Sequence, residues 1–156
     1  MNAEILDKFT TLYGKPCCRK NVGERKSLSL GFGRKIYNAP KMRGPAFYGE
    51  WEIGTYSCAW RVIKDNIVIC GSTDPVDSNV ELDSMLNKID FNCIIQISQY
   101  NSIDVHVDFN NGVCVDFLST ISDDDECFHV FCPRHQCITF APRIGWRICD
   151  SSRGEK

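Results

Sequence analysis

The sequence of 156 residues has no long apolar segment, no export-signal pattern and no internal repeat. A membrane-spanning helix needs roughly 20 consecutive apolar residues, and no stretch approaches that length. A signal peptide begins with basic residues followed by an apolar run, whereas residues 1–13 are polar and mixed in charge. We therefore expect a cytoplasmic protein without membrane association. Its length fits one domain, since single cores commonly run to about 100–200 residues.

Catalytic and phosphate-binding motifs are also missing. The segment GFGRK at residues 31–35 lacks the further glycines and the Lys-Ser/Thr ending of a phosphate loop. Basic residues are scattered through the first third in single and double steps, and the acidic middle of the chain would repel phosphate. We therefore expect no cofactor and no nucleic-acid binding.

Ten cysteines, in contrast, are many for a chain of this size. An even number suggests disulfides in a secreted protein, but there is no export signal here. Most of the cysteines lie inside apolar strand patterns, as in NCII at residues 92–95 and VCV at residues 113–115. Free cysteine behaves as a small buried hydrophobe, so we expect reduced thiols, most of them in or near the core, in a reducing cytosol.

One cysteine-rich segment offers four potential zinc ligands, Cys127, Cys132, His135 and Cys137. Thiolate and imidazole suit tetrahedral zinc. However, the spacing matches no common C-x-x-C pattern, and the two ligands His135 and Cys137 lie too close in sequence to share a tetrahedron without strain. We favour an ordinary hairpin with buried thiols and no metal. A zinc-stabilised nucleic-acid-binding module is an alternative.

Apolar periodicity predicts an α+β fold. Helical spacing appears over residues 3–13 and again after Ser78 or Asn79, either of which can cap a helix. Strand patterns occupy residues 27–32, 51–63, 68–70, 93–98, 103–109, 113–118, 128–131 and 137–140. Residues 15–26 and 38–49 have the composition of loops.

These elements indicate one domain over residues 1–150, mainly a single antiparallel sheet with one or two helices on a face, and a frayed tail over residues 151–156. The strand ending at Ile63 and its return over residues 68–70 form a hairpin that is apolar on both faces. We therefore expect this hairpin near the centre of the sheet, covered on both sides.

The clearest local pattern is the hairpin at residues 103–118, where apolar and polar residues alternate on both sides of Asn110-Asn111-Gly112. A two-residue turn would mix the two faces. A three-residue loop, with Gly112 in the left-handed conformation, keeps all the apolar residues on one face. The outer face then carries Asp104, His106, Asp108 and Asp116, with His106 opposite Asp116.

His106 facing Asp116 resembles half of a catalytic triad, and Cys114 is its neighbour in sequence. The simpler interpretation is a solvated cross-strand ion pair. We favour the ion pair and predict no catalytic residue. A small cysteine-dependent enzyme is the second alternative.

Charge is strongly segregated along the chain. Residues 1–49 hold ten Lys or Arg against three acids, whereas residues 50–126 hold three bases against fifteen acids. Such segregation can create a local field even when the net charge is only −2. A fold that interleaves the two segments would instead neutralise them.

Two stretches carry a resemblance to known proteins. SLSLGFG at residues 27–33, followed by GEWEI at 49–53 and YSCAWR at 56–61, resembles a family of uncharacterised small bacterial proteins with the same strand, loop and Trp-Arg strand order. In size, acidic face and lack of catalytic groups, the chain also resembles the immunity proteins of bacterial toxin systems, including contact-dependent growth inhibition. That resemblance implies a non-enzymatic inhibitor.

We accordingly expect an immunity-type inhibitor that neutralises a basic toxin domain, a nuclease in the first instance. A toxin that acts on nucleic acid needs a positively charged cleft. Carboxylates on a rigid sheet can fill such a cleft, and their charge speeds association with the toxin by electrostatic steering. The expected partner contacts are Asp104, Asp108, Asp116, Asp123, Asp124, Asp125 and Glu126.

Overall fold

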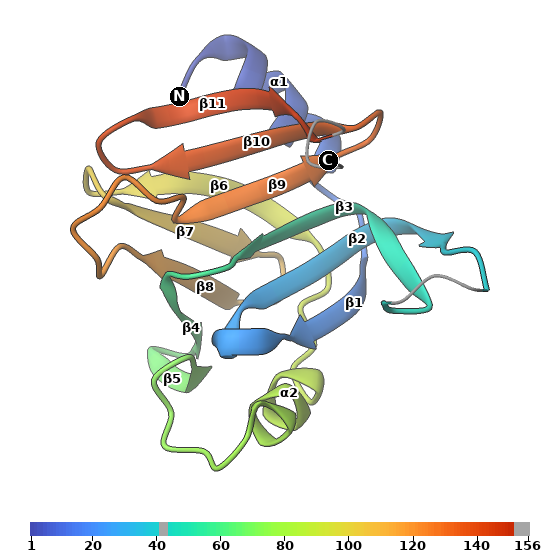
Figure 1. The fold of residues 1–156 in the computed structure, drawn as a ribbon, viewed down its shortest axis with the longest axis vertical. Coiled ribbons are helices and arrows are strands. Elements are labelled where there is room, and N and C mark those ends of the chain that lie inside the picture. Colours follow the sequence, from blue (N-terminus) through green and yellow to red (C-terminus); the bar gives the residue numbers. More distant parts are fainter. Residues whose placement is uncertain (41–43, 152–156) are drawn as a thin grey trace.

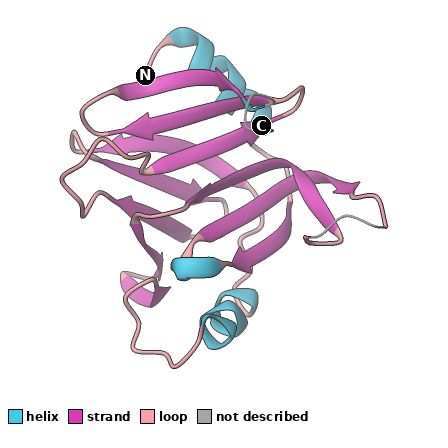
Figure 2. Ribbon diagram, in the orientation of Figure 1, coloured by secondary structure: helices cyan, strands magenta, loops and turns pink. Residues whose placement is uncertain are grey.

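The computed structural model describes residues 1–40 and 44–151, and its strands form two sheets packed face to face (Figures 1 and 2). The six-stranded sheet has the order β1 (Cys17–Val22), β2 (Leu28–Tyr37), β3 (Phe47–Thr55), β9 (Phe128–Cys132), β10 (Gln136–Ala141), β11 (Gly145–Asp150). The five-stranded sheet has the order β5 (Ile67–Gly71), β4 (Ala59–Lys64), β8 (Val113–Leu118), β7 (Asp104–Phe109), β6 (Ile94–Tyr100). All neighbouring strands are antiparallel.

The hydrophobic core lies between the two sheets. Phe32 of β2 stacks on Phe109 of β7 with 6.1 Å between ring centroids. Phe117 of β8 meets Phe128 of β9 edge-on at 4.8 Å. These buried rings belong to one continuous cluster that joins both sheets. The expected α+β fold is confirmed, but its strands are divided over two sheets rather than gathered in one.

Helix α1 (Ala3–Leu12) closes one open side of the sandwich, where β6 and β11 end the two sheets. Asn2 caps the helix by accepting a hydrogen bond from the Ile5 amide at 3.0 Å. Phe9 packs against Trp146 of β11 with 5.6 Å between ring centroids. The hydroxyl of Tyr13, just after the helix, accepts a bond from the β6 backbone.

Helix α2 (Asn79–Asn87) closes the opposite side, where β1 and β5 are the outermost strands. Ser78 caps it by accepting from the Glu81 amide at 3.3 Å. Leu82 and Leu86 are fully buried, as the helical spacing predicts. Lys20 of β1 donates to the main-chain carbonyl of Asn87 at the end of the helix. Neither helix is long and apolar enough to cross a membrane, and this holds for every helix among the described residues.

The β7–β8 hairpin has the predicted register. His106 lies opposite Asp116, and Val107 lies opposite Val115. Gly112 adopts a φ of 81°, the left-handed conformation that the three-residue loop requires. The expected hairpin at residues 128–140 is also confirmed, as β9 and β10.

Residues 17–22, expected in a loop, form the edge strand β1 instead. An edge strand is held by main-chain pairing to one neighbour and needs no fully apolar face. The polar composition of residues 17–22 therefore resembled that of a loop. Strand β3 likewise begins at Phe47, inside the expected loop 38–49. Strand β11 had no recognisable pattern in the sequence. The frayed tail expected at residues 151–156 falls outside the described residues except for Ser151.

The β4–β5 hairpin lies at the edge of its sheet, not at the centre. Its turn residues Asp65 and Asn66 have positive φ, the geometry of a tight hairpin. Ile67 and Val68 of β5 are 67% and 50% exposed. The apolar character of these residues suggested that both faces of the hairpin are buried. This expectation is wrong for β5, because the strand has only one neighbouring strand and its first residues are exposed.

Candidate functional site

The outer face of the β4–β8–β7 strands holds the first group of expected contacts, and His106 joins two of them. Its Nδ1 lies 2.6 Å from Asp116 Oδ1, and its Nε2 lies 3.1 Å from Asp108 Oδ1. Carboxylates only accept hydrogen bonds, so the protonated ring satisfies both contacts. Arg61 Nε donates to the second oxygen of Asp116 at 2.7 Å. Asp116 is only 6% exposed as a result.

The pKa values in this cluster reflect these pairings. The hydrogen bond with Asp116 raises the pKa of His106, although burial opposes it. Burial alone would raise the pKa of Asp116, but the bonds from His106 and Arg61 lower it. Burial, together with Asp116 and Asp108, raises the pKa of Cys114 and so disfavours its thiolate. With both ring nitrogens of His106 facing carboxylates, the cluster is arranged as an ion-pair network.

Asp104 is also engaged within the fold. Its two oxygens accept from the Ser119 amide at 2.8 Å and from the Asn101 side chain at 3.1 Å. All three aspartates are therefore bonded within the fold, but the side chain of Asp108 stays 38% exposed.

The acidic loop at residues 122–126 holds the second group. Asp123, Asp124 and Asp125 are exposed. Asp124 lies 3.8 Å from Arg143, and both side chains are more than half exposed. Glu126 is different, because its Oε1 accepts from His129 Nδ1 at 2.8 Å and ties the loop to β9.

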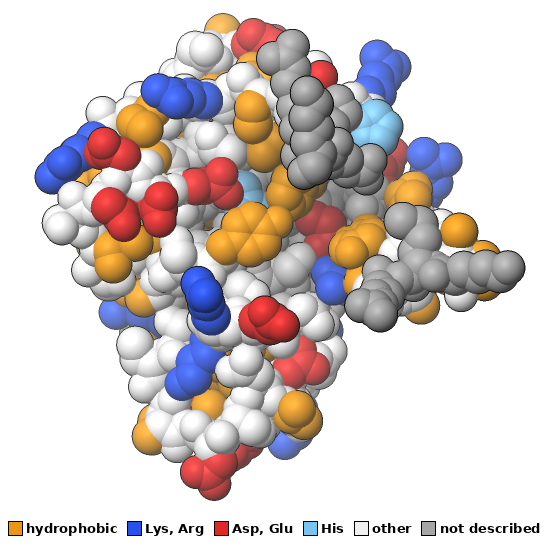
Figure 3. Space-filling model, viewed as in Figure 1, with side chains coloured by type: hydrophobic (Ala, Val, Ile, Leu, Met, Phe, Trp, Pro, Cys, Tyr) orange, Lys and Arg blue, Asp and Glu red, His pale blue; other side chains and the backbone are white. Residues whose placement is uncertain are grey.

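A polar hollow of about 220 Å³ lies beside this loop, in the outer face of the six-stranded sheet. Figure 3 views this face and shows acidic side chains gathered over the loop before β9. The register sets Gly54 of β3 between Ser29 of β2 and His129 of β9. A β-carbon on Gly54 would lie 2.0 Å from the carbonyl oxygen of Leu28, so the position requires glycine.

A nearly buried ion pair forms one side of the hollow. Arg19 Nη1 donates to Glu52 Oε2 at 2.9 Å, and their side chains are 12% and 7% exposed. The Gly49 amide donates to Glu52 Oε1 at 2.7 Å, and the Ser29 hydroxyl donates to Oε2. The ring of Tyr48 lies 5.2 Å from the Arg19 guanidinium. Every charge in this group is thus fixed in position.

His129 forms the other side, with its side chain 4% exposed. Because a carboxylate only accepts, Nδ1 carries the proton of the bond to Glu126. Nε2 has no hydrogen-bond partner among the described residues, and it lies over Gly54, whose β-carbon would be 3.3 Å away. Tyr56 covers the imidazole with 4.5 Å between ring centroids.

The basic and acidic segments of the sequence interleave here. Arg19 pairs with Glu52, and Lys15 and Arg34 lie 3.4 and 3.5 Å from the two oxygens of Glu50. The basic first third therefore neutralises acids of β3, while the acids at residues 123–125 keep their exposure.

The cysteines are free thiols, and five of them, Cys58, Cys70, Cys127, Cys132 and Cys137, are buried. Cys17 is partly buried and packs against the core, so the expectation that most of the thiols lie in or near the core holds. Burial raises the pKa of Cys132 to about 11. No group of three or more potential metal ligands comes together within residues 1–40 and 44–151, so the four candidate zinc ligands do not share a site there.

No protein-family model, no curated protein and no solved structure matches this chain.

Proposed function

We propose that this protein is a non-enzymatic binding protein, an immunity-type inhibitor that neutralises a basic toxin domain through the acidic loop and the adjacent hollow. The observation that carries the proposal is the link between Glu126 and His129. This contact connects the acidic loop at residues 122–126 to the preorganised hollow on the rigid six-stranded sheet.

Charge supports a basic partner. Within the hollow, Arg19 offsets Glu52. Beside it, the partly exposed Glu126 contacts His129 from the acidic loop. The acids at residues 123–125 of the same loop are exposed. An exposed loop of one charge sign raises association rates for a partner of opposite sign and selects against acidic surfaces.

The walls of the hollow have the composition of an interface core. Tyr56 and Tyr48 are 61% and 41% exposed. Tyr48 lies beside the fixed Arg19, and Tyr56 lies against His129. Tyrosine and arginine are enriched among residues that dominate binding energy, because they add large contact area with a polar end. Anchoring them on strands reduces the entropy lost on binding.

The set of proposed contacts is correspondingly narrower than the sequence suggested. Asp123, Asp124, Asp125 and Glu126 remain, joined by Tyr56. We assign Asp104 and Asp116 a structural role, since both are bonded within the fold. Asp108, partly exposed, is left as a peripheral contact.

A matched pair of charge reversals tests the proposal. The partner for this test is a basic nuclease domain encoded beside the gene of this protein. Its binding is measured by calorimetric titration at low and at high salt. Asp123→Lys with Asp125→Lys should weaken binding by about tenfold or more, a loss of about 1.4 kcal/mol, and should reduce the salt dependence. Asp7→Lys with Asp77→Lys makes the same change in net charge at exposed sites on and beside the helices.

The control variant should bind within about twofold of the native protein, because screening removes the influence of charges beyond about 10 Å. Equal losses in the two variants would show that only net charge matters and would refute the site. Failure of the native protein to bind any basic domain would refute the function.

A further inference from the structure

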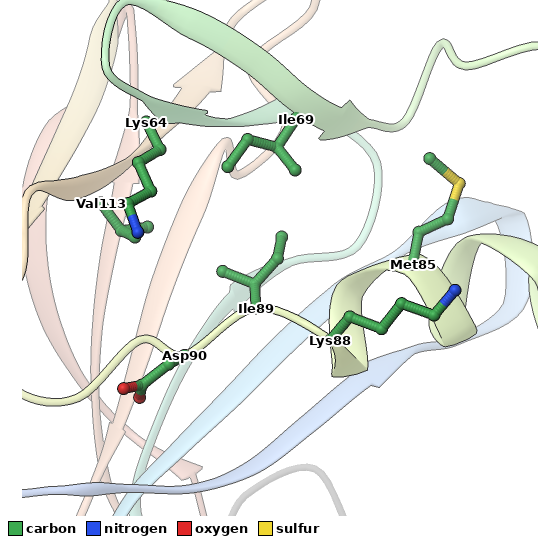
Figure 4. A pocket seen from close by; sticks show the side chains of 7 residues that line it. All are labelled: Lys64, Ile69, Met85, Lys88, Ile89, Asp90 and Val113. Carbon is green, nitrogen blue, oxygen red and sulfur yellow. The ribbon is translucent and has the colours of Figure 1, made fainter.

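A second cavity, of about 460 Å³, opens at the side of the sandwich that α2 covers (Figure 4). It lies between the five-stranded sheet and the end of α2, away from the outer face that carries the hollow. Its walls are mainly apolar, formed by Ile69, Met85, Ile89 and Val113. The cavity is a continuation of the core to the surface, with a volume in the range of small-molecule sites.

Lys64 has an unusual place in this cavity. Along β4, Trp60 and Val62 face the core and are 1% and 0% exposed, and Lys64 is the next residue in that row. It pairs in register with Val113, which is 2% exposed. Figure 4 shows its side chain extending into the cavity beside Val113. Lys64 itself is exposed at the end of β4, so its ammonium group stands at the open mouth of the cavity, at a position where the alternation of the strand calls for an apolar side chain.

No carboxylate of the described residues neutralises this ammonium. None lies within 4.0 Å of Lys64 Nζ, and no hydrogen bond satisfies it within residues 1–40 and 44–151. Asp90 lines the cavity, but its side chain points away in Figure 4 and its Oδ1 accepts from the Asn92 amide at 3.0 Å. Lys88 also lines the cavity, and its side chain extends away from Lys64 (Figure 4). Of the two lysines that line the cavity, Lys64 is therefore the one that extends beside Val113.

We propose that this cavity binds a small carboxylate carried on an apolar chain, such as a medium-chain fatty acid. The apolar chain would lie between Ile69 and Ile89, which face each other across the cavity (Figure 4). Met85 can adapt to chains of different shape, because its side chain is unbranched and flexible. A single ammonium balances the single charge of a carboxylate. A phosphate carries more charge and is usually held by several donors.

Titration with decanoate below its micellar concentration, followed by amide chemical shifts, tests the proposal. Binding should be saturable, and the shifted amides should cluster around Ile69, Ile89 and Val113. Lys64→Met removes the charge at similar length and should weaken decanoate binding about tenfold or more. Lys88→Met, the matched control on the same cavity, should leave it within about twofold. Decanol should bind the native protein more weakly and should not respond to Lys64→Met.

Two results would overturn the proposal. Equal effects of Lys64→Met and Lys88→Met would show that no specific ion pair forms, and absence of saturable decanoate binding to the native protein would remove the site. Tighter binding of decyl phosphate than of decanoate would overturn the assignment of the head group. None of these outcomes depends on a toxin partner, so the test is independent of the proposed inhibitor function.

Discussion

Replacement of Arg19 by methionine measures what the ion pair beside the hollow contributes to folding. Arg19 Nη1 donates to Glu52 Oε2 at 2.9 Å and to Ser29 Oγ at 3.1 Å. Methionine keeps much of the apolar stem and removes the charge and its donors. The Glu52 carboxylate would then keep only the Gly49 amide and the Ser29 hydroxyl as donors.

The size of the effect follows from the burial of both groups. At 2.9 Å and an effective dielectric constant of about 20, the attraction is about 6 kcal/mol before desolvation is subtracted. Removing one partner of a buried pair costs about 3–5 kcal/mol, because the other charge remains buried. We expect about 3 kcal/mol for Arg19→Met, since Glu52 retains two hydrogen bonds. The double variant with Glu52→Gln should lose only about 1–2 kcal/mol, because no buried charge is left.

Urea unfolding followed by tryptophan fluorescence provides the measurement. Arg34→Met serves as the control, because Arg34 is 79% exposed and lies 3.5 Å from Glu50. Its loss should stay below about 1 kcal/mol, the usual range for an exposed pair. The reasoning fails if Arg19→Met is no more costly than Arg34→Met, or if the double variant is as unstable as Arg19→Met alone.

Two further predictions concern stability. Because pairing raises the pKa of His106 in the folded state, its stabilising effect is full below its ordinary pKa of 6.5 and is lost as the pH rises through the raised value. His106→Asn should therefore flatten the fall in unfolding free energy as the pH rises above the ordinary pKa of 6.5, and unchanged slopes in urea titrations would contradict this. Gly54→Ala should cost about 3 kcal/mol or more, because its β-carbon would overlap the Leu28 carbonyl. Gly112→Ala, with open space around it but a φ of +81°, should cost only about 1 kcal/mol in thermal unfolding, and equal losses at the two glycines would refute the packing argument.

Patterns in the sequence predicted those elements that are determined by interactions between residues close together in the chain. The β7–β8 register followed from alternation and from the need for a left-handed residue at Gly112. Helix α2 followed from its apolar spacing and a capping serine. The division into two sheets did not follow, because it depends on which strands pair across long stretches of chain, and β3 pairs with β9.

The hollow was not predicted either, because it also depends on contacts between residues far apart in the sequence. Arg19 and Glu52 are 33 residues apart, and Arg19 lies in a stretch that looked like a loop. Glu126 and His129 are near each other in sequence, but nothing local places them over Gly54. The glycines at 31, 49 and 54 were the available signal, since glycine within a strand pattern often marks a close approach of other atoms.

The six-stranded sheet is built from two groups of strands that lie at opposite ends of the sequence. Strands β1–β3 end at Thr55, and β9 begins only at Phe128, with the whole five-stranded sheet between them. Three residue pairs at the β3–β9 junction, including Gly54 with His129, bring the two halves of the hollow together. During synthesis the ribosome must therefore release His129 before the hollow can form, however early the first strands pair. A chain interrupted before β9 would carry Arg19 and Glu52 without the imidazole opposite them, so the complete hollow reports that β9 has been made and paired with β3.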